Sequence, residues 1–301
     1  MLAWGAVVAG VAAPFVRRKL RLPAPAVIGT AALAPFGLSV ATPRTRNRDV
    51  AVCVLQMWAY FAAYQMPNDD PEALQRRVHV DYPVRIDRAI GLGELPSVRL
   101  QRAFGAPGRI QWREKVLIWP HWLWFFVPHS AVAYLLFHHR ERFPAGAVQM
   151  YAVFDLGAIV YWALPTAPPW YAAEEGALGP REPTVRRLMR EHGQAVWKGA
   201  WEPLYDVLGG NPLAAMPSLH FATSVMSAHV LADAGPVQGA LGWSYAGVLG
   251  LALVYLGEHY VVDLLAGLAL TEGVRRAAPR VAPALGRVSR GVQVLEERVR
   301  G

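Results

Sequence analysis

The sequence contains few charged residues and almost no cysteine. Charged residues make up 17% of its 301 residues, against roughly 25% in an ordinary soluble protein. Cys53 is the one cysteine, which excludes an intramolecular disulfide and a cysteine-based metal site. No internal repeat is visible, which argues against the paired halves from which many transporters are built.

Apolar residues, in contrast, are abundant. They make up 54% of the chain, which includes 11 tryptophans, and most of the apolar stretches approach the roughly 20 residues that span a bilayer as a helix. The sequence therefore predicts an all-α fold, a polytopic membrane helix bundle with six core transmembrane helices plus one or two N-terminal ones. The apolar stretches lie at about residues 2–16, 24–42, 50–66, 116–137, 147–164, 214–233, 239–256 and 259–274.

Composition divides the chain into three expected parts. Residues 1–48 hold the N-terminal membrane segments, which we interpret as retained spans because no basic region precedes the first apolar run. Residues 49–276 form the main membrane domain. Residues 277–301 form a basic tail whose apolar residues recur every three or four positions, which predicts an amphipathic helix that rests on anionic lipid or makes a coiled-coil contact.

The formal net charge of +8 raises the question of a nucleic-acid partner. The basic residues cluster between apolar segments, and no stretch alternates aromatic and basic residues in the manner of single-strand binding proteins. Loop orientation and anionic lipid headgroups explain the charge better. The expected partners are membrane lipids, with no nucleic acid.

Loop charges also predict an orientation. If every apolar stretch spans, the long polar loops 67–115 and 165–213 fall on one side of the membrane, whereas the short basic segments 43–49 and 138–142 and the tail fall on the other. Short basic loops stay in the cytoplasm. The long loops are therefore expected outside, at the plasma membrane, although the basic segment 17–21 disagrees.

The segment "EHYVVD" places two ionisable residues in an apolar setting. His259 and Asp263 are four residues apart, so on a helix they share one face. The carboxylate can accept a hydrogen bond from imidazole Nδ1 and leave Nε2 free as a nucleophile or base. The alternative is a buried pair that only links helices. Ionisable residues within membrane segments are by default a functional hypothesis.

The segment "MPSLH" places a second histidine at a helix start. Pro217 suits the first turn of a helix, so Ser218 and His220 are expected at its N-terminal end, where free backbone N–H groups favour an anion. The alternative to a catalytic role for His220 is a solvated histidine at the membrane interface. Together, His220, His259 and Asp263 predict phosphoryl transfer without metal or cofactor. His259 attacks phosphorus, Asp263 orients it, and His220 shuttles the proton of the departing or arriving oxygen.

"MPSLH" followed by "HYVVD" resembles the PSxH and HxxxD motifs of the type-2 phosphatidic acid phosphatase superfamily of membrane phosphatases and phosphotransferases. The resemblance covers about residues 155–270, and more weakly 80–102. It implies that His220, His259 and Asp263 are the catalytic triad.

The phosphatase branch usually carries Lys and Arg in a KxxxxxxRP motif and Ser-Arg before the second histidine. This chain has "LPTAPPW" at 164–170 and Ala252-Leu253 instead. The combination resembles the inositol phosphorylceramide synthase-like branch, which transfers a phosphoinositol headgroup between lipids.

A phosphate in a partly dry pocket needs positive partners, so the missing cations require substitutes. The alternative for any one candidate is a solvated loop charge. In "PTAPPW", Pro168 and Trp170 are expected either to form a rigid rim beside the substrate or to end a helix with an aromatic anchor. The candidate cations are Arg85, Arg88, Arg186, Arg187 and Lys198.

Other interpretations stay open. The acceptor decides between hydrolase and transferase, so a lipid phosphate phosphatase is the nearest alternative. A transporter or structural membrane protein with buried His–Asp pairs is a different class. A haem protein leaves Ser218 and Asp263 unexplained, and a zinc site lacks a convincing third ligand. Four more polar residues fall in apolar stretches, of which the last is expected to face away from the site: Asp155, His121, His129 and His229.

Overall fold

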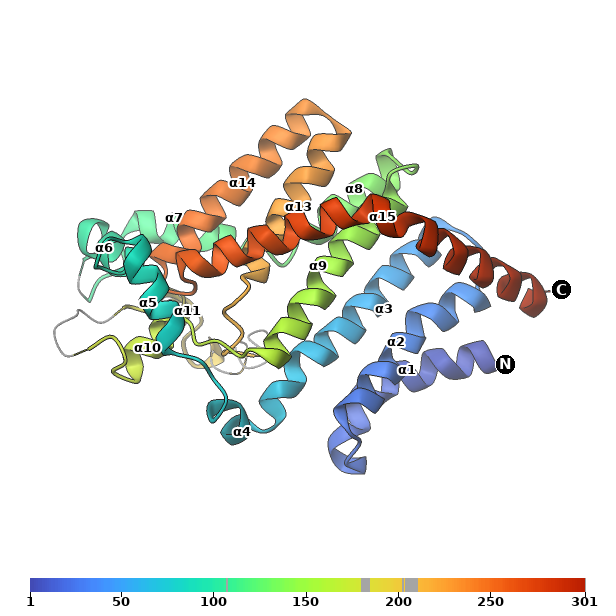
Figure 1. Cartoon of the computed structure of the whole chain (residues 1–301), viewed down its shortest axis with the longest axis horizontal. Coiled ribbons are helices and arrows are strands. Elements are labelled where there is room, and N and C mark those ends of the chain that lie inside the picture. The colour runs from blue at the N-terminus through green and yellow to red at the C-terminus, as the bar shows by residue number, and fades with distance from the viewer. Residues whose placement is uncertain (107, 180–184, 202, 204–210, 301) are drawn as a thin grey trace.

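A computed structural model describes residues 1–106, 108–179, 185–201, 203 and 211–300. These residues form an α-helical bundle without a β-strand (Figure 1), so the predicted all-α fold class is confirmed. Its long helices are α1 (Leu2–Leu20), α2 (Ala24–Ala41), α3 (Arg46–Gln65), α9 (Phe143–Ala163), α13 (Leu219–Ala234), α14 (Pro236–Tyr255) and α15 (Val261–Arg300).

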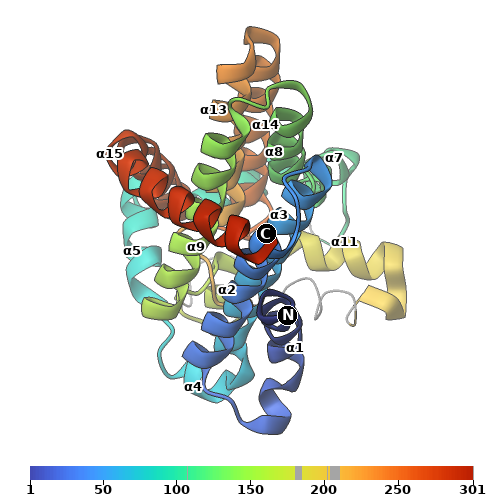
Figure 2. The ribbon, with the colours of Figure 1, turned by 90° about the vertical axis from the view of Figure 1, so that its right-hand side faces the viewer.

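Shorter helices connect them. They are η1 (Met66–Asp69), α4 (Pro71–Gln75), α5 (Asp81–Ile90), α6 (Pro96–Phe104), α7 (Trp112–Leu123), α8 (Val127–His138), α10 (Pro169–Glu174), α11 (Leu188–Trp197) and η2 (Lys198–Ala200). Most of them belong to the two long polar loops, and these gather at one end of the bundle (Figures 1 and 2).

Helix α13 is the centre of the bundle, and it packs against α8, α9, α14 and α15. Its small polar residues are buried and bond within the helix. The hydroxyl of Thr223 donates to Leu219 O at 2.7 Å, and the hydroxyl of Ser227 donates to Thr223 O at 2.8 Å. Such bonds to the preceding turn satisfy hydroxyls that have no water, so neighbouring helices can cover α13 on all sides.

Three described helices are long and apolar enough to cross a membrane. They are α2, α9 and α14, which match the apolar stretches predicted at 24–42, 147–164 and 239–256. Each is 18 to 21 residues long, about 27–32 Å at 1.5 Å per residue. The chain is therefore a membrane protein, while the larger count of spans stays a prediction.

One predicted span, residues 116–137, is interrupted. Helix α7 ends at Leu123 and α8 begins at Val127, with tight turns between them such as Phe126 N to Leu123 O at 2.9 Å. Pro128 has no N–H to donate to Trp124, and its ring opposes the carbonyl at that position. A proline disfavours the interior of a helix but is tolerated in its first turn, where Pro128 lies, and Trp124 of the turn contacts α13 through Thr223.

The two long loops are joined by backbone pairing. His79 N donates to Pro165 O at 2.9 Å, and Thr166 N donates to Leu213 O at 3.0 Å. These bonds line up three extended segments around His79, Thr166 and Ala214. The "PTAPPW" segment therefore lies between the first loop and the approach to "MPSLH".

The short basic segments meet at the opposite end. Arg140 of the α8–α9 turn lies 3.6 Å from Asp49, and Arg44 of the α2–α3 turn pairs with Glu296 at 2.9 Å. Glu296 belongs to α15, which runs without interruption from 261 to 300 and passes the expected domain boundary at 276. The loops and the basic turns thus occupy different ends of the molecule, as expected.

Candidate active site

His220 lies in the first turn of α13, at the end of the bundle that carries the long loops. Ser218 is the N-cap of this helix, and its buried hydroxyl accepts from Phe221 N at 3.3 Å. Tyr161 of α9 donates its hydroxyl proton to Pro217 O at 2.7 Å and accepts from Leu219 N at 3.3 Å. The turn before His220 is therefore held by α9 as well as by its own cap.

His259 follows a tight turn and precedes α15. Gly257 has φ +78°, and a Cβ there would approach a Val185 methyl carbon to 2.7 Å, so the turn requires glycine. We expected His259 and Asp263 to share one helix face, but α15 begins only at Val261. The carboxylate of Asp263 folds back instead: its Oδ2 accepts from Tyr260 N at 2.9 Å and from His259 Nδ1 at 3.4 Å.

The starts of α13 and α15 touch directly. Ser218 N donates to the backbone oxygen of Asp263 at 3.0 Å. A Cβ on Gly267 would come within 2.7 Å of Ser218 O, so only glycine permits this approach. Ser218 therefore lies beneath the histidines as a cap and a spacer, and its hydroxyl is not among the described groups that line the pocket.

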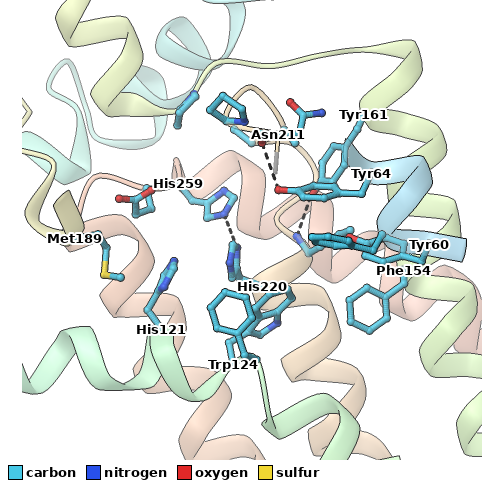
Figure 3. A pocket seen from close by; sticks show the side chains of 18 of the residues that line it. Tyr60, Tyr64, His121, Trp124, Phe154, Tyr161, Met189, Asn211, His220 and His259 are labelled. Atoms are coloured by element: carbon cyan, nitrogen blue, oxygen red, sulfur yellow. Dashed lines mark hydrogen bonds between the residues drawn. The ribbon is translucent and has the colours of Figure 1, made fainter. Parts of the chain in front are cut away.

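The two histidines form one hydrogen bond. His220 Nδ1 lies 3.1 Å from His259 Nε2 (Figure 3). With the Nδ1 proton of His259 directed to Asp263, Nε2 of His259 is the acceptor and His220 Nδ1 the donor. Asp263 and His259 are buried. The arrangement leaves a nucleophilic nitrogen whose lone pair faces the second imidazole.

Aromatic side chains enclose His220. The ring of Trp124 lies 4.2 Å from it and that of His121 lies 4.7 Å from it, both between centroids. The indole N–H of Trp124 donates to the Thr223 hydroxyl at 2.8 Å. Both side chains come from the end of α7 and the turn at 124–126, within the stretch 116–137 that was predicted to be one span. The prolines at 120 and 128 were the available signal.

A pocket of about 430 Å³ opens beside the histidine pair. It runs between α3, α9 and the α7–α8 turn, and its described lining is mainly apolar and aromatic, with residues such as Trp58, Tyr64 and Phe154. Pro168 and Trp170 of "PTAPPW" line it too. No Lys or Arg is among the described lining residues, whereas Glu258 is. An apolar ligand with a small polar head suits such a pocket.

Arg187 is the candidate cation nearest this pocket. Its guanidinium stacks over Trp170, with Cζ 3.6 Å from the ring centroid, and its Nε lies 3.7 Å from Glu258 Oε1. Trp170 N donates to Gly257 O at 3.2 Å, which ties this group to the turn before His259. The structure therefore brings Arg187, Trp170 and Pro168 to the edge of the site.

The other candidate cations are engaged elsewhere or exposed. Arg186 donates to Ala106 O at 2.8 Å and pairs with Glu191. The pKa of Arg186 is raised mainly by its hydrogen bond to Glu191. Arg88 donates to Leu178 O. The side chains of Arg85 and Lys198 are exposed. Position in the sequence therefore did not distinguish Arg187 from its neighbours, because stacking on Trp170 depends on how the loops fold.

Several polar atoms in the pocket wall have no hydrogen-bond partner among the described residues. They are His121 Nδ1, Asn211 Nδ2 and Glu258 Oε1. Burial of such groups is costly unless a ligand or water satisfies them. In the same part of the chain, no group of three His, Cys, Asp or Glu residues has the geometry of a metal site.

Comparison with known proteins gives one match. The sequence model of the PAP2 superfamily matches residues 85–274, more than half of the chain. The matched region contains both histidines, Asp263 and the pocket residues from α7 onward. No curated protein and no solved structure matches the chain.

Proposed function

Because the chain belongs to the PAP2 superfamily, we propose that it is a membrane-embedded phosphotransferase or phosphatase acting on lipid phosphate esters. Members of this superfamily are generally phosphatases or phosphotransferases. The observation that carries the proposal is the contact of 3.1 Å between His220 Nδ1 and His259 Nε2, with Asp263 behind His259. A nucleophile, an acid–base group and an orienting carboxylate thus stand in one line.

In the proposed first step, His259 Nε2 attacks the phosphorus of the donor lipid. A P–N bond forms while the bond from phosphorus to the lipid oxygen breaks. Asp263 holds the Nδ1 proton of His259 and stabilises the positive charge that develops on that ring. His220 begins this step protonated on both ring nitrogens and donates one proton to the departing alkoxide, which leaves as a neutral alcohol while His220 becomes neutral.

In the second step, His220 takes a proton from the acceptor hydroxyl. The acceptor oxygen attacks phosphorus, the P–N bond breaks, and His259 returns to its neutral state. Water as acceptor gives hydrolysis, and a lipid or other alcohol gives transfer. No metal ion takes part in either step, so we expect activity to persist in a chelator.

Substrate binding must first separate the two rings. A phosphorus atom at bonding distance from His259 Nε2 occupies the position that His220 Nδ1 holds at 3.1 Å. The phosphoryl group therefore replaces the His220–His259 hydrogen bond and then contacts both rings. This replacement is compatible with the proposed roles, because each ring needs the phosphoryl group or its leaving oxygen as partner.

Transfer of a headgroup from a phosphodiester is favoured over hydrolysis of a phosphomonoester. The described pocket lining contains Glu258 and no Lys or Arg. A diester carries one negative charge and a monoester up to two, so the diester loses less on entering an apolar pocket. A phosphoinositol-type headgroup fits the proposal. We assign Arg187 and Trp170 to the edge of the pocket where the phosphate binds. There Arg187 leaves its ion pair with Glu258 and pairs with the phosphate of the substrate.

A labelling experiment tests this function. The purified protein is incubated with a phosphatidylinositol donor labelled in the inositol ring, or with phosphatidic acid labelled in its phosphate, in the presence and absence of EDTA. We expect acid-labile label on the wild type with the inositol donor, because the intermediate keeps the headgroup. We expect His259→Ala to carry none, and EDTA to have no effect.

The acceptor is tested in the same assay. Ceramide, diacylglycerol or water is supplied to the labelled protein, and the labelled product is separated. Label from phosphatidic acid alone, released as inorganic phosphate, would identify a lipid phosphate phosphatase. Absence of covalent label from every donor, with intact protein, would refute the phosphohistidine mechanism.

A further inference from the structure

We propose that His121 is a third imidazole of the active site, whose Nδ1–H binds a nonbridging oxygen of the substrate's phosphoryl group. The inference rests on the proposed function and adds a phosphate-binding residue that the PSxH and HxxxD motifs do not contain. His121 is the third residue from the end of α7 and lies far in sequence from both motifs.

The position of His121 is the first argument. Its ring lies 4.7 Å from the ring of His220 between centroids, and it lines the same pocket as His220 and His259. In Figure 3 it projects from α7 toward the two rings. A phosphoryl group that separates His220 from His259 must therefore lie next to His121 as well.

The missing partner is the second argument. His121 Nδ1 is buried and has no hydrogen-bond partner in the described part of the chain. A buried imidazole nitrogen without a partner costs free energy. A phosphoryl oxygen selects the tautomer with the proton on Nδ1 and satisfies it, so the cost is recovered only when substrate is bound.

The supports of His121 are the third argument. Tyr245 of α14 donates to Pro120 O at 2.8 Å, which fixes the last turn of α7. Three residues after His121, Trp124 is tied to α13 through Thr223. The backbone that carries His121 is thus fixed before any ligand arrives, as expected of a group that stabilises charge in a transition state.

The chemistry of the pocket is the fourth argument. Its described lining offers no Lys or Arg to the three equatorial oxygens of a phosphoryl group. Neutral N–H donors stabilise developing negative charge without the desolvation cost of a fixed cation. His121 supplies such a donor beside the ring of His220.

Two substitutions separate donation from packing. His121→Phe keeps a ring against His220 but removes the donor, whereas His121→Asn removes the ring but keeps an N–H close to the position of Nδ1. We expect kcat/KM for the donor lipid to fall by about 10²-fold in the Phe variant and by less than about tenfold in the Asn variant. His138→Phe, an exposed histidine at the end of α8, is the matched control.

Inhibition by orthovanadate provides a measurement that a change in packing alone would not alter. It mimics the phosphoryl group, so its inhibition constant should rise at least about tenfold in His121→Phe and stay near the wild-type value in His121→Asn and His138→Phe. Gel filtration and thermal unfolding in detergent check that each variant is folded.

The outcomes are distinct. Equal vanadate inhibition in the Phe and Asn variants, whether weakened in both or unchanged in both, would show that Nδ1 is not a phosphoryl ligand. Wild-type protein that neither turns over a lipid phosphate nor binds vanadate would instead refute the proposed function itself.

Discussion

At the scale of single residues, Asp263 has two tasks. Its Oδ2 accepts from Tyr260 N at 2.9 Å, which caps α15, and from His259 Nδ1 at 3.4 Å, which orients the proposed nucleophile. The longer distance to the imidazole is common in sites without substrate. Its other carboxylate oxygen is buried without a partner among the described residues, so the charge of Asp263 is directed at His259 and the helix start.

Replacement of Asp263 by Asn separates these tasks. The amide keeps the size and one acceptor oxygen, so the fold and the cap should survive with a loss of about 1–2 kcal/mol. The charge that fixes the tautomer of His259 is lost, and kcat should fall by about 10²–10⁴-fold. Initial rates and thermal unfolding of the same preparation measure both effects. A wild-type kcat would reduce Asp263 to a structural role.

The sequence identified some residues of the candidate site and missed others. His220, His259 and Asp263 lie in two short motifs, so local spacing was enough to single them out. His121, Trp124 and Glu258 reach the pocket only because α7 ends where it does and because loops from distant parts of the chain meet. No periodicity reports such contacts.

At the scale of elements, apolar runs predicted helices well but did not locate helix ends. The stretch at 147–164 appears as α9, and that at 239–256 appears as α14. The stretch at 116–137 was expected as one span because its composition is uniform. Pro128 lies in the first turn of α8, where its missing N–H is tolerated, and the chain turns just before it.

The start of α15 depends on a carboxylate from another element. Asp87 of α5 accepts from Val262 N at 3.0 Å, and burial raises its pKa to about 6, although this hydrogen bond lowers it. The folded protein therefore binds the Asp87 proton more tightly than the unfolded chain. The contribution of this group to stability is greatest below about pH 4, falls as the pH rises toward 6, and is constant above.

Thermal unfolding of Asp87→Asn in detergent tests this pH dependence. The amide cannot ionise, so it avoids the cost that the wild type bears above pH 6. We expect the Tm of the variant relative to the wild type to increase between pH 4.5 and pH 7, by on the order of 5 °C. A relative Tm that decreases over this interval would mean that the ionised carboxylate stabilises the fold.

At the scale of the whole molecule, the two ends of the bundle differ. One carries the long loops and the histidine pair, and the other joins the basic turns and the end of α15 through Arg140, Asp49, Arg44 and Glu296. Because short basic segments are retained in the cytoplasm, we propose that the histidine end faces the extracytoplasmic side of the plasma membrane. The basic segment at 17–21 is the exception, and Arg17 pairs with Asp69 at 2.7 Å.

Cysteine labelling tests this orientation. In a Cys53→Ser background, single cysteines replace Glu175 at the histidine end and Arg140 at the basic end, both of which are exposed. We expect a membrane-impermeant maleimide to label Glu175→Cys in intact cells and Arg140→Cys only after permeabilisation. The reverse pattern would place the histidines in the cytoplasm.

The hydrogen bond between His220 and His259 sets a size requirement for productive ligands. A molecule that reaches only one ring must break this bond without replacing it, and so gains little from entering. A molecule that bridges both rings restores as many hydrogen bonds as it removes. The nucleophilic nitrogen of His259 therefore stays hydrogen-bonded to His220 until a phosphoryl group that contacts both rings replaces this bond.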